Sequence, residues 1–174
     1  MYRRILTAAM LAASFVLPAA ASPSIEEFHA TFAGFNETPL AILSEGAAHL
    51  TLKLDRAAQT VWFELTYSGL SAPVTQSHIH FGKVHVTGSV MVFFCSNVGG
   101  PAGVQACPAN GGTVTGTITA ANILGIATQH VTAGDFDALT DALASNTAYA
   151  NIHSTNFPGG EIRGQIHRGA DDAD

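Results

Sequence analysis

Charged residues are scarce in this 174-residue chain. Asp, Glu, Lys and Arg make up only 11% of it, with 7 basic residues against 13 acidic ones and a net charge of −6. Sparse and mostly negative charge argues against nucleic acid as a partner and against electrostatic docking on anionic lipid. The hydrophobic content of 47% favours a folded chain with its own core, and the length suits one domain.

Familiar motifs of catalysis and nucleotide binding are also missing. The chain has no G-x-S-x-G nucleophile motif, no Rossmann or Walker pattern, and no repeat of the lengths typical of solenoids and propellers. Gly159-Gly160 reads as a turn and lacks the spacing of a phosphate loop. The sequence therefore predicts neither a nucleotide cofactor nor nucleophilic catalysis, and it favours a function other than an enzyme.

Long apolar runs are missing too, except at the beginning of the chain. Arg3 and Arg4 precede a small, apolar stretch at 5–17, and Ala19-Ala20-Ala21 offers a cleavage site. These features predict a cleaved signal peptide over 1–21 and an exported protein, secreted or periplasmic. The alternative is an uncleaved membrane anchor, although the run is shorter than the ~20 residues that a span needs.

Cysteine occurs only twice, at Cys95 and Cys107. Export to an oxidising compartment makes a disulfide between them the leading prediction, with the Gly-rich segment 96–106 as a loop closed at its base. A free or metal-bound thiol pair is the alternative. The two cysteines lack C-x-x-C spacing, which argues against that alternative.

Alternation of apolar and polar residues predicts a mainly β domain over 22–170, followed by a solvated acidic tail at 171–174. The alternation is strictest at Leu50, Leu52 and Leu54. Stretches of strand character are found at 28–35, 49–54, 60–67, 76–81, 89–95, 113–119, 149–154 and 161–166. About eight short strands separated by turns predict a single antiparallel Greek-key β-sandwich or barrel.

One short helix is predicted late in the chain. Thr132-Ala133-Gly134-Asp135 resembles a capping box with Asp in place of Glu. Phe136, Leu139 and Leu143 then recur at helical spacing, and Asn146 can end the helix.

Two of the predicted strands carry histidine on one face. His78 and His80 are two residues apart, so their side chains share a face, and His153 lies on a second polar strand. Three neutral imidazoles can bind copper or zinc and leave one position for water or a fourth ligand. In the alternative, these histidines are buried and hydrogen-bonded and tie strands together, with Asn151 and Ser154 as partners. The residue pattern leaves both interpretations open.

The other five histidines show no comparable clustering in the sequence. His49 lies on the face opposite the Leu50 row, so we expect it to be exposed. His85 follows the His80 strand closely enough to join a site through a loop. The remaining three are His29, His130 and His167.

Glu161 and Arg163 share a face of the last predicted strand. We expect a structural ion pair between them, or between Arg163 and another carboxylate, in preference to a catalytic role.

Six segments that span almost the whole predicted domain resemble the CHRD domain family, named after the extracellular protein chordin. The resemblance lies in F-A-G-F-N-E-T-P at 32–39, L-T-Y-S-G-L at 65–70, S-H-I-H-F-G at 77–82, G-T-V-T-G at 112–116, Y-A-N-I-H-S at 149–154 and P-G-G-E-I-R-G-Q at 158–165. It implies an exported, single-domain β-protein and supplies no reaction. The chain departs from the family at Lys83-Val84-His85, where a small, Gly-rich loop is usual.

The H-x-H strand also gives a more distant likeness to copper/zinc superoxide dismutase. His78 and His80 would match the copper-binding pair of that enzyme, but the rest of its histidine-rich zinc site is missing here. We therefore expect an exported binding domain that holds copper or zinc through His78, His80 and His153, with an unidentified protein or small ligand as partner. The alternative is a structural or interaction module of the cell envelope without metal or catalysis.

Overall fold

The structure is a computed structural model and describes residues 25–169. The predicted signal peptide and acidic tail lie outside the described residues. The first antiparallel sheet has the order β6-β3-β2-β1-β9 and consists of β1 (Ile25–Phe32), β2 (Ala47–Asp55), β3 (Thr60–Ser68), β6 (Gly112–Ile118) and β9 (His167–Arg168). The second sheet has the order β5-β4-β7-β8 and consists of β4 (Val74–Phe81), β5 (Ser89–Ser96), β7 (Ala148–Ser154) and β8 (Ile162–Gln165).

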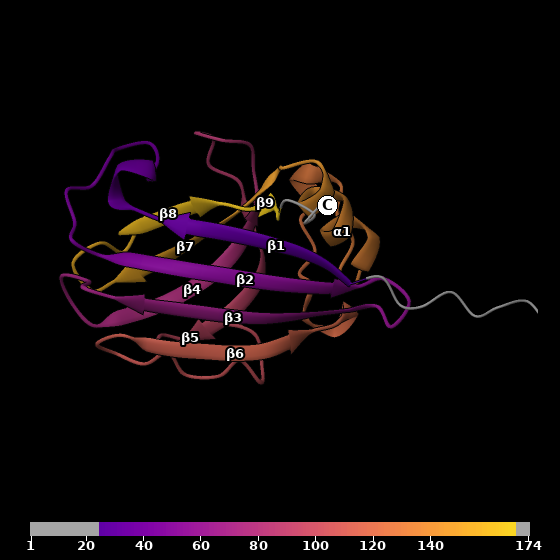
Figure 1. Cartoon of the computed structure of the whole chain (residues 1–174), viewed down its shortest axis with the longest axis horizontal. Coiled ribbons are helices and arrows are strands. Elements are labelled where there is room, and N and C mark those ends of the chain that lie inside the picture. The colour runs from indigo at the N-terminus through magenta and orange to yellow at the C-terminus, as the bar shows by residue number, and fades with distance from the viewer. Residues whose placement is uncertain (1–24, 170–174) are drawn as a thin grey trace, which may run out of the picture.

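The two sheets form the two layers of a sandwich. Figure 1 shows β1, β2, β3 and β6 in front of the second sheet, and the helix α1 (Phe136–Ala144) at one end. β9 returns to pair with β1, so β9-β1-β2-β3 follow the Greek-key order. The predicted Greek-key sandwich with one inserted helix is thus confirmed, and neither sheet closes into a barrel.

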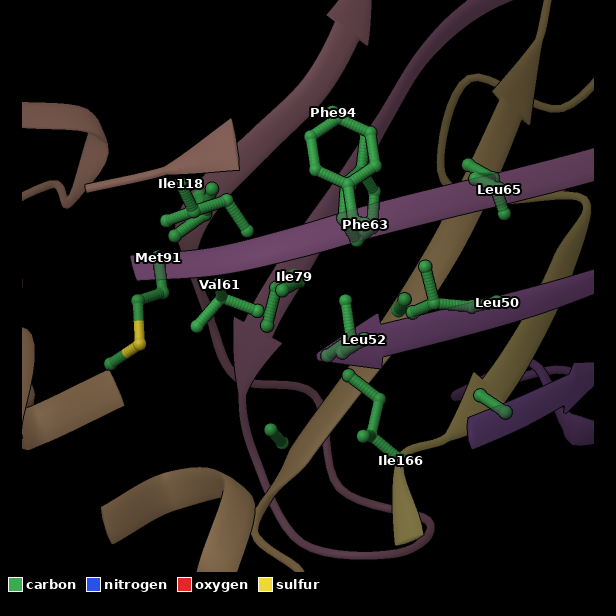
Figure 2. Close-up of a cluster of buried hydrophobic side chains, with 14 of the residues drawn as sticks. Leu50, Leu52, Val61, Phe63, Leu65, Ile79, Met91, Phe94, Ile118 and Ile166 are labelled. Carbon is green, nitrogen blue, oxygen red and sulfur yellow. The ribbon is translucent and has the colours of Figure 1, made fainter. Parts of the chain in front are cut away.

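The core lies between the sheets because each strand turns its apolar residues inward. Every second residue of β2 and β3 is buried along most of both strands, as the period of two requires. In Figure 2 these residues meet Ile79 of β4 and Phe94 of β5 from the opposite sheet. The rings of Phe63 and Phe94 pack with centroids 4.8 Å apart. Burial of this apolar surface is the main force that holds the two layers together.

The helix begins later than predicted. Its N-cap is Asp135, whose carboxylate accepts a hydrogen bond from the backbone N–H of Ala138 at 3.0 Å, so the proposed capping box at Thr132 is wrong. Phe136, Leu139 and Leu143 are buried as expected from their spacing. Short 3₁₀ turns occupy Gly34–Asn36, Ala120–Asn122 and Ala127–Gln129. No helix in the described part of the chain is long and apolar enough to cross a membrane.

The predicted disulfide is confirmed. Cys95 of β5 is bonded to Cys107 in the loop that leads to β6. Inside this loop, the Asn97 amide donates to the carbonyl oxygens of Val74 and Cys107, and its oxygen accepts from the Cys107 N–H. The bond and these contacts fix the base of the loop against the edge of the second sheet.

Candidate functional site

The outer face of the second sheet is polar, yet it is buried. His78 and His80 of β4, Asn151 and His153 of β7, and Arg163 of β8 are all 2–7% exposed. One face of an antiparallel sheet is commonly left to solvent. Polar groups that are buried instead must find partners or bind a ligand, because leaving them unpaired costs free energy.

Three loops cover this face and are held by the side chains beneath them. The Arg163 guanidinium donates to Thr38 Oγ1 at 2.6 Å in the β1–β2 loop, and to backbone carbonyls in the β4–β5 loop. His80 Nδ1 lies 3.0 Å from the carbonyl oxygen of Gly88, also in the β4–β5 loop. His153 Nδ1 lies 2.9 Å from that of Pro158, in the β7–β8 loop.

The strand register brings the three histidines together. β4 and β7 are antiparallel neighbours in which His78 is opposite Asn151 and His80 is opposite Tyr149. His153 is two positions from Asn151 on β7, so it is diagonal to His78 on the same face. The ring centroid of His78 lies 5.2 Å from that of His80 and 4.8 Å from that of His153.

One nitrogen from each of the three rings can be chosen so that all lie within 4.8 Å of one another. Among the described residues, His78, His80 and His153 are the one such group of three or more potential metal ligands. The predicted convergence of these rings is therefore confirmed. His85 is exposed and does not join them.

The hydrogen bonds decide which ring nitrogens carry protons. Only an N–H can bond a carbonyl oxygen, so Nδ1 of His80 and Nδ1 of His153 are the protonated atoms. The Nε2 atoms of the neutral rings are then unprotonated. Nε2 of His153 and Nε2 of His78 are both buried without a hydrogen-bond partner.

Burial keeps all three imidazoles neutral at pH 7. Desolvation, helped by repulsion from the neighbouring rings, lowers the pKa of His78 to about 3. Desolvation also lowers the pKa of His80 to about 4, although the Gly88 carbonyl opposes this. The pKa of His153 is lowered by burial as well, against the effect of its bond to Pro158. Neutral imidazole is the form that binds a metal.

Asn151 places an oxygen among these nitrogens. Its Oδ1 lies 3.0 Å from His80 Nε2, and His78 Nδ1 lies 3.3 Å from the same nitrogen. Since His80 holds its proton on Nδ1, its Nε2 can only accept, so His78 Nδ1–H is the donor of this contact and His78 Nε2 is left unprotonated. The Nε2 lone pairs of His78 and His153, which have no hydrogen-bond partner, and the Asn151 oxygen beside His80 can attract a cation.

An aromatic and cationic stack supports the site from β7 and β8. Tyr149 lies parallel to His80, with ring centroids 4.6 Å apart and an interplanar angle of 6°. The Arg163 guanidinium carbon lies 3.4 Å from the Tyr149 ring centroid. This order of His80, Tyr149 and Arg163 fixes the His80 ring plane and brings a positive charge near the site.

The expected ion pair between Glu161 and Arg163 is not formed. Glu161 precedes β8, and its carboxylate accepts from Ser44 Oγ at 2.7 Å, from the Ser71 N–H at 2.7 Å and from Ser154 Oγ. Burial alone would raise the pKa of Glu161, but these hydrogen bonds lower it below its ordinary value. Its three donors come from other parts of the chain, so Glu161 holds loops together instead of neutralising Arg163.

Glu37 is a buried carboxyl that sequence reasoning missed. It is 7% exposed, and its Oε1 is buried without a partner. Burial raises the pKa of Glu37 to about 7, against the opposing effects of the Thr38 N–H, Arg163 and Asn151. The E-T-P turn at 37–39 gave no sign that its Glu would be enclosed, because the enclosing residues lie far along the chain.

The histidines that we expected to be unclustered are only partly so. His49 is exposed, as its position opposite the Leu50 row predicts. However, His29, His85 and His167 line one hollow at the edge of the sandwich. His29 and His167 meet because β9 pairs with β1 and sets these two residues opposite each other, which the sequence did not indicate.

The match to a known protein family covers nearly the same residues as the fold described above. The CHRD domain matches residues 28–166, which include the triad, Glu37, Arg163 and both cysteines. The chain belongs to the CHRD domain family. No curated protein and no solved structure matches the sequence significantly. Membership indicates a binding module, and the likeness to superoxide dismutase continues to rest on the H-x-H motif alone.

Proposed function

We propose that this CHRD domain is an exported binding protein that holds one copper or zinc ion on His78, His80 and His153. The observation that carries the proposal is the arrangement of lone pairs. Two of the three rings donate their Nδ1–H to a backbone carbonyl, Nε2 of His78 and Nε2 of His153 are buried without a hydrogen-bond partner, and Nε2 of His80 lies 3.0 Å from the oxygen of Asn151. Metal-binding histidines are commonly oriented in this manner by a hydrogen bond from the other ring nitrogen.

The spacing is close to what an ion requires. Metal–nitrogen bonds of ~2.0–2.1 Å in a tetrahedral site place ligand nitrogens ~3.4 Å apart. The three rings offer nitrogens within 4.8 Å of one another, so small ring rotations would close the set. The Asn151 oxygen or a water molecule would take the fourth position. Copper and zinc suit neutral imidazole better than magnesium or calcium do, since these prefer oxygen ligands.

The surroundings of the triad carry charges of both signs. Arg163 lies near His80 and disfavours further positive charge there. Glu37 lies beside Asn151 and can supply one negative charge when it ionises. An ionised Glu37 therefore offsets the positive charge of Arg163, and the metal ion is bound by its ligands alone.

Three features of the chain support export. The first is the predicted signal peptide at 1–21. The disulfide between Cys95 and Cys107 is the second, because such bonds persist in oxidising compartments. Family membership is the third, since the family takes its name from an extracellular protein. We infer a secreted or periplasmic location.

A second candidate function needs no metal. The bonds of His80 to Gly88 and of His153 to Pro158 would by themselves pin two loops to the sheet. Rotation of the Asn151 amide would then present its NH₂ group to His80 Nε2, and a protonated Glu37 would face the amide oxygen. In this case the domain is a structural or interaction module, and the triad is part of its internal bonding.

Metal titration separates the two candidates. Zn²⁺ and Cu²⁺ are titrated by calorimetry into the purified, chelator-treated protein at pH 7, and binding of one ion per chain is expected. His80→Ala should abolish this binding, whereas His49→Ala, which removes an exposed histidine, should leave it unchanged. Saturable binding that survives His80→Ala, or none in the wild type, would favour the structural module. A melting curve for each variant checks that it is folded.

The pH dependence of binding gives a second test. Exposed histidines lose metal as the pH falls through ~6.5, where they become protonated. Burial lowers the pKa of His78 to about 3 and that of His80 to about 4, so protons compete only at lower pH. Binding that persists at pH 5.5 is expected for the triad, and binding lost near pH 6.5 would indicate surface histidines.

A further inference from the structure

A second polar site lies where the two sheets meet at one edge. Chain segment 162–168 pairs with β7 through β8 and returns to β1 through β9. It meets β1 and the residue after it at two places in the same antiparallel register, at the pair of His29 with His167 and at the isolated bridge of Ala33 with Arg163. Between these places Gln165 pairs with Tyr149 of the second sheet, so the two segments separate.

A hollow of about 570 Å³ opens beside this separation. Such a volume falls in the range of small-molecule sites. The hollow is lined by residues from β1, β8, β9 and the β4–β5 loop. Its walls are therefore formed by the neighbouring edges of the two sheets and by the β4–β5 loop.

The lining of the hollow is cationic in a chain of net charge −6. Arg163, Arg168 and the imidazoles of His29, His85 and His167 all line it. Among the described residues, no acidic side chain is part of the lining. Two guanidinium groups and three imidazoles around one hollow form a site for negative charge, since guanidinium groups bind carboxylates and phosphates and an imidazole N–H can donate to them.

Arg163 provides the rigid part of this site. It is 2% exposed and is held by the oxygens of Thr38, Lys83 and Val86 and by the face of Tyr149. Its Nη1 and Nη2 atoms make those hydrogen bonds. A guanidinium fixed in this manner binds an anion with little loss of side-chain freedom.

Arg168 provides the adaptable part. Its side chain is about half exposed, and its guanidinium contacts Glu26 on β1. Glu26 has a second partner, Arg56, which contacts the same carboxylate and is not part of the hollow. Arg168 can therefore turn toward a ligand while Glu26 keeps a positive partner.

We propose that this hollow binds a small organic or inorganic anion bearing a carboxylate or phosphate group. Arg163 would hold the anion from the inner wall, and Arg168 with the three histidines would surround it from the rim. The site does not share its ligands with the triad and does not depend on a bound metal.

The test uses citrate and inorganic phosphate as probes, with glycerol as a neutral control. Binding to the purified, metal-free protein is measured by calorimetry at low ionic strength, where surface charge is least screened. We expect saturable binding of at least one anion and none of glycerol. The anion that binds more tightly identifies the head group as carboxylate or phosphate.

Arg168→Gln and Arg56→Gln form a matched pair of variants. Each removes one positive charge and one contact with Glu26, but only Arg168 lines the hollow. Arg168→Gln should weaken anion binding about tenfold, the effect of losing one charge-assisted hydrogen bond, and Arg56→Gln should leave it within about twofold. Equal weakening by both variants, or no saturable binding of either anion, would overturn the proposal. His167→Gln, compared with His49→Gln, repeats the test on the imidazoles.

Discussion

Replacement of Arg163 by Met should destabilise the domain strongly, because one guanidinium joins two loops to the second sheet. It donates to Thr38 in the β1–β2 loop and to the carbonyl oxygens of Lys83 and Val86 in the β4–β5 loop. It also stacks on Tyr149, with its central carbon 3.4 Å from the ring centroid. Met keeps much of the side-chain volume and removes every polar contact.

The magnitude follows from what is lost and what is regained. A desolvated cation–π contact contributes about 2 kcal/mol, and a hydrogen bond from a charged donor contributes roughly 1.5–3 kcal/mol. The carbonyls of Lys83 and Val86 lie in exposed residues, so water can replace part of their bonding. The guanidinium also no longer has to be desolvated. A net loss of about 3 kcal/mol remains, which lowers the melting temperature by about 10 °C at this chain length.

Arg168→Met is the matched control. Arg168 is about half exposed and contacts Glu26, which keeps Arg56 as a partner. Exposed ion pairs contribute about 0–1 kcal/mol, so this variant should stay close to the wild type. Urea and thermal unfolding followed by circular dichroism measure both proteins. If Arg163→Met were no less stable than Arg168→Met, the guanidinium would not hold the loops, and our account of the outer face would be wrong.

Three other predictions concern the loops, the disulfide and a buried carboxyl. Gly160→Ala should lower the unfolding free energy by at least ~2 kcal/mol, because Gly160 has φ 128° and a Cβ there would lie 2.6 Å from Glu37 Oε1. Gly159→Ala is the control, since a Cβ at Gly159 would meet nothing within 4 Å. Equal stability of the two variants would contradict the close packing. Replacing both Cys95 and Cys107 by Ser should lower the unfolding free energy by about 3 kcal/mol, the loop-closure effect for a separation of 12 residues, and an unchanged urea midpoint would refute it. Glu37 has a folded-state pKa of about 7 against 4.5 for the ordinary group, so its ionisation removes stability as the pH rises between these values. As the pH rises from 4.5 to 8, the unfolding free energy of Glu37→Gln should therefore increase by about 3 kcal/mol relative to that of the wild type, as measured by urea unfolding. If this difference between the two proteins stayed constant, the carboxyl of the folded protein would already be ionised at pH 4.5.

Local pattern was sufficient for the strands and for the pairing of imidazoles on one face. The alternation of Leu50, Leu52 and Leu54 can bury one face only in an extended chain, and β2 has this arrangement. The same period of two places His78 and His80 side by side whatever the rest of the fold does. With a single cysteine pair, the disulfide also had one possible partner for each residue.

Local pattern was misleading where polar residues alternate with apolar ones. The alternation through β7 and β8 is the pattern of a strand with one solvated face, but here the polar face is buried beneath three loops. The predicted pairing of Glu161 with Arg163 failed for the same reason. Some partners of both side chains lie more than 75 residues away in the sequence, such as Thr38 for Arg163 and Ser44 for Glu161.

The sequence by itself thus determined the strands, the pairing of the two cysteines and the shared face of His78 and His80, and it narrowed the fold to a β-sandwich or barrel. All of these follow from short-range geometry or from a single possible pairing. Only the tertiary structure decided that His153 completes a triad, that Glu37 is enclosed, and that His29, His85 and His167 surround one hollow. These features depend on which loops fold over which sheet edge. That choice is made by the packing of the whole chain, which leaves no local periodicity to read.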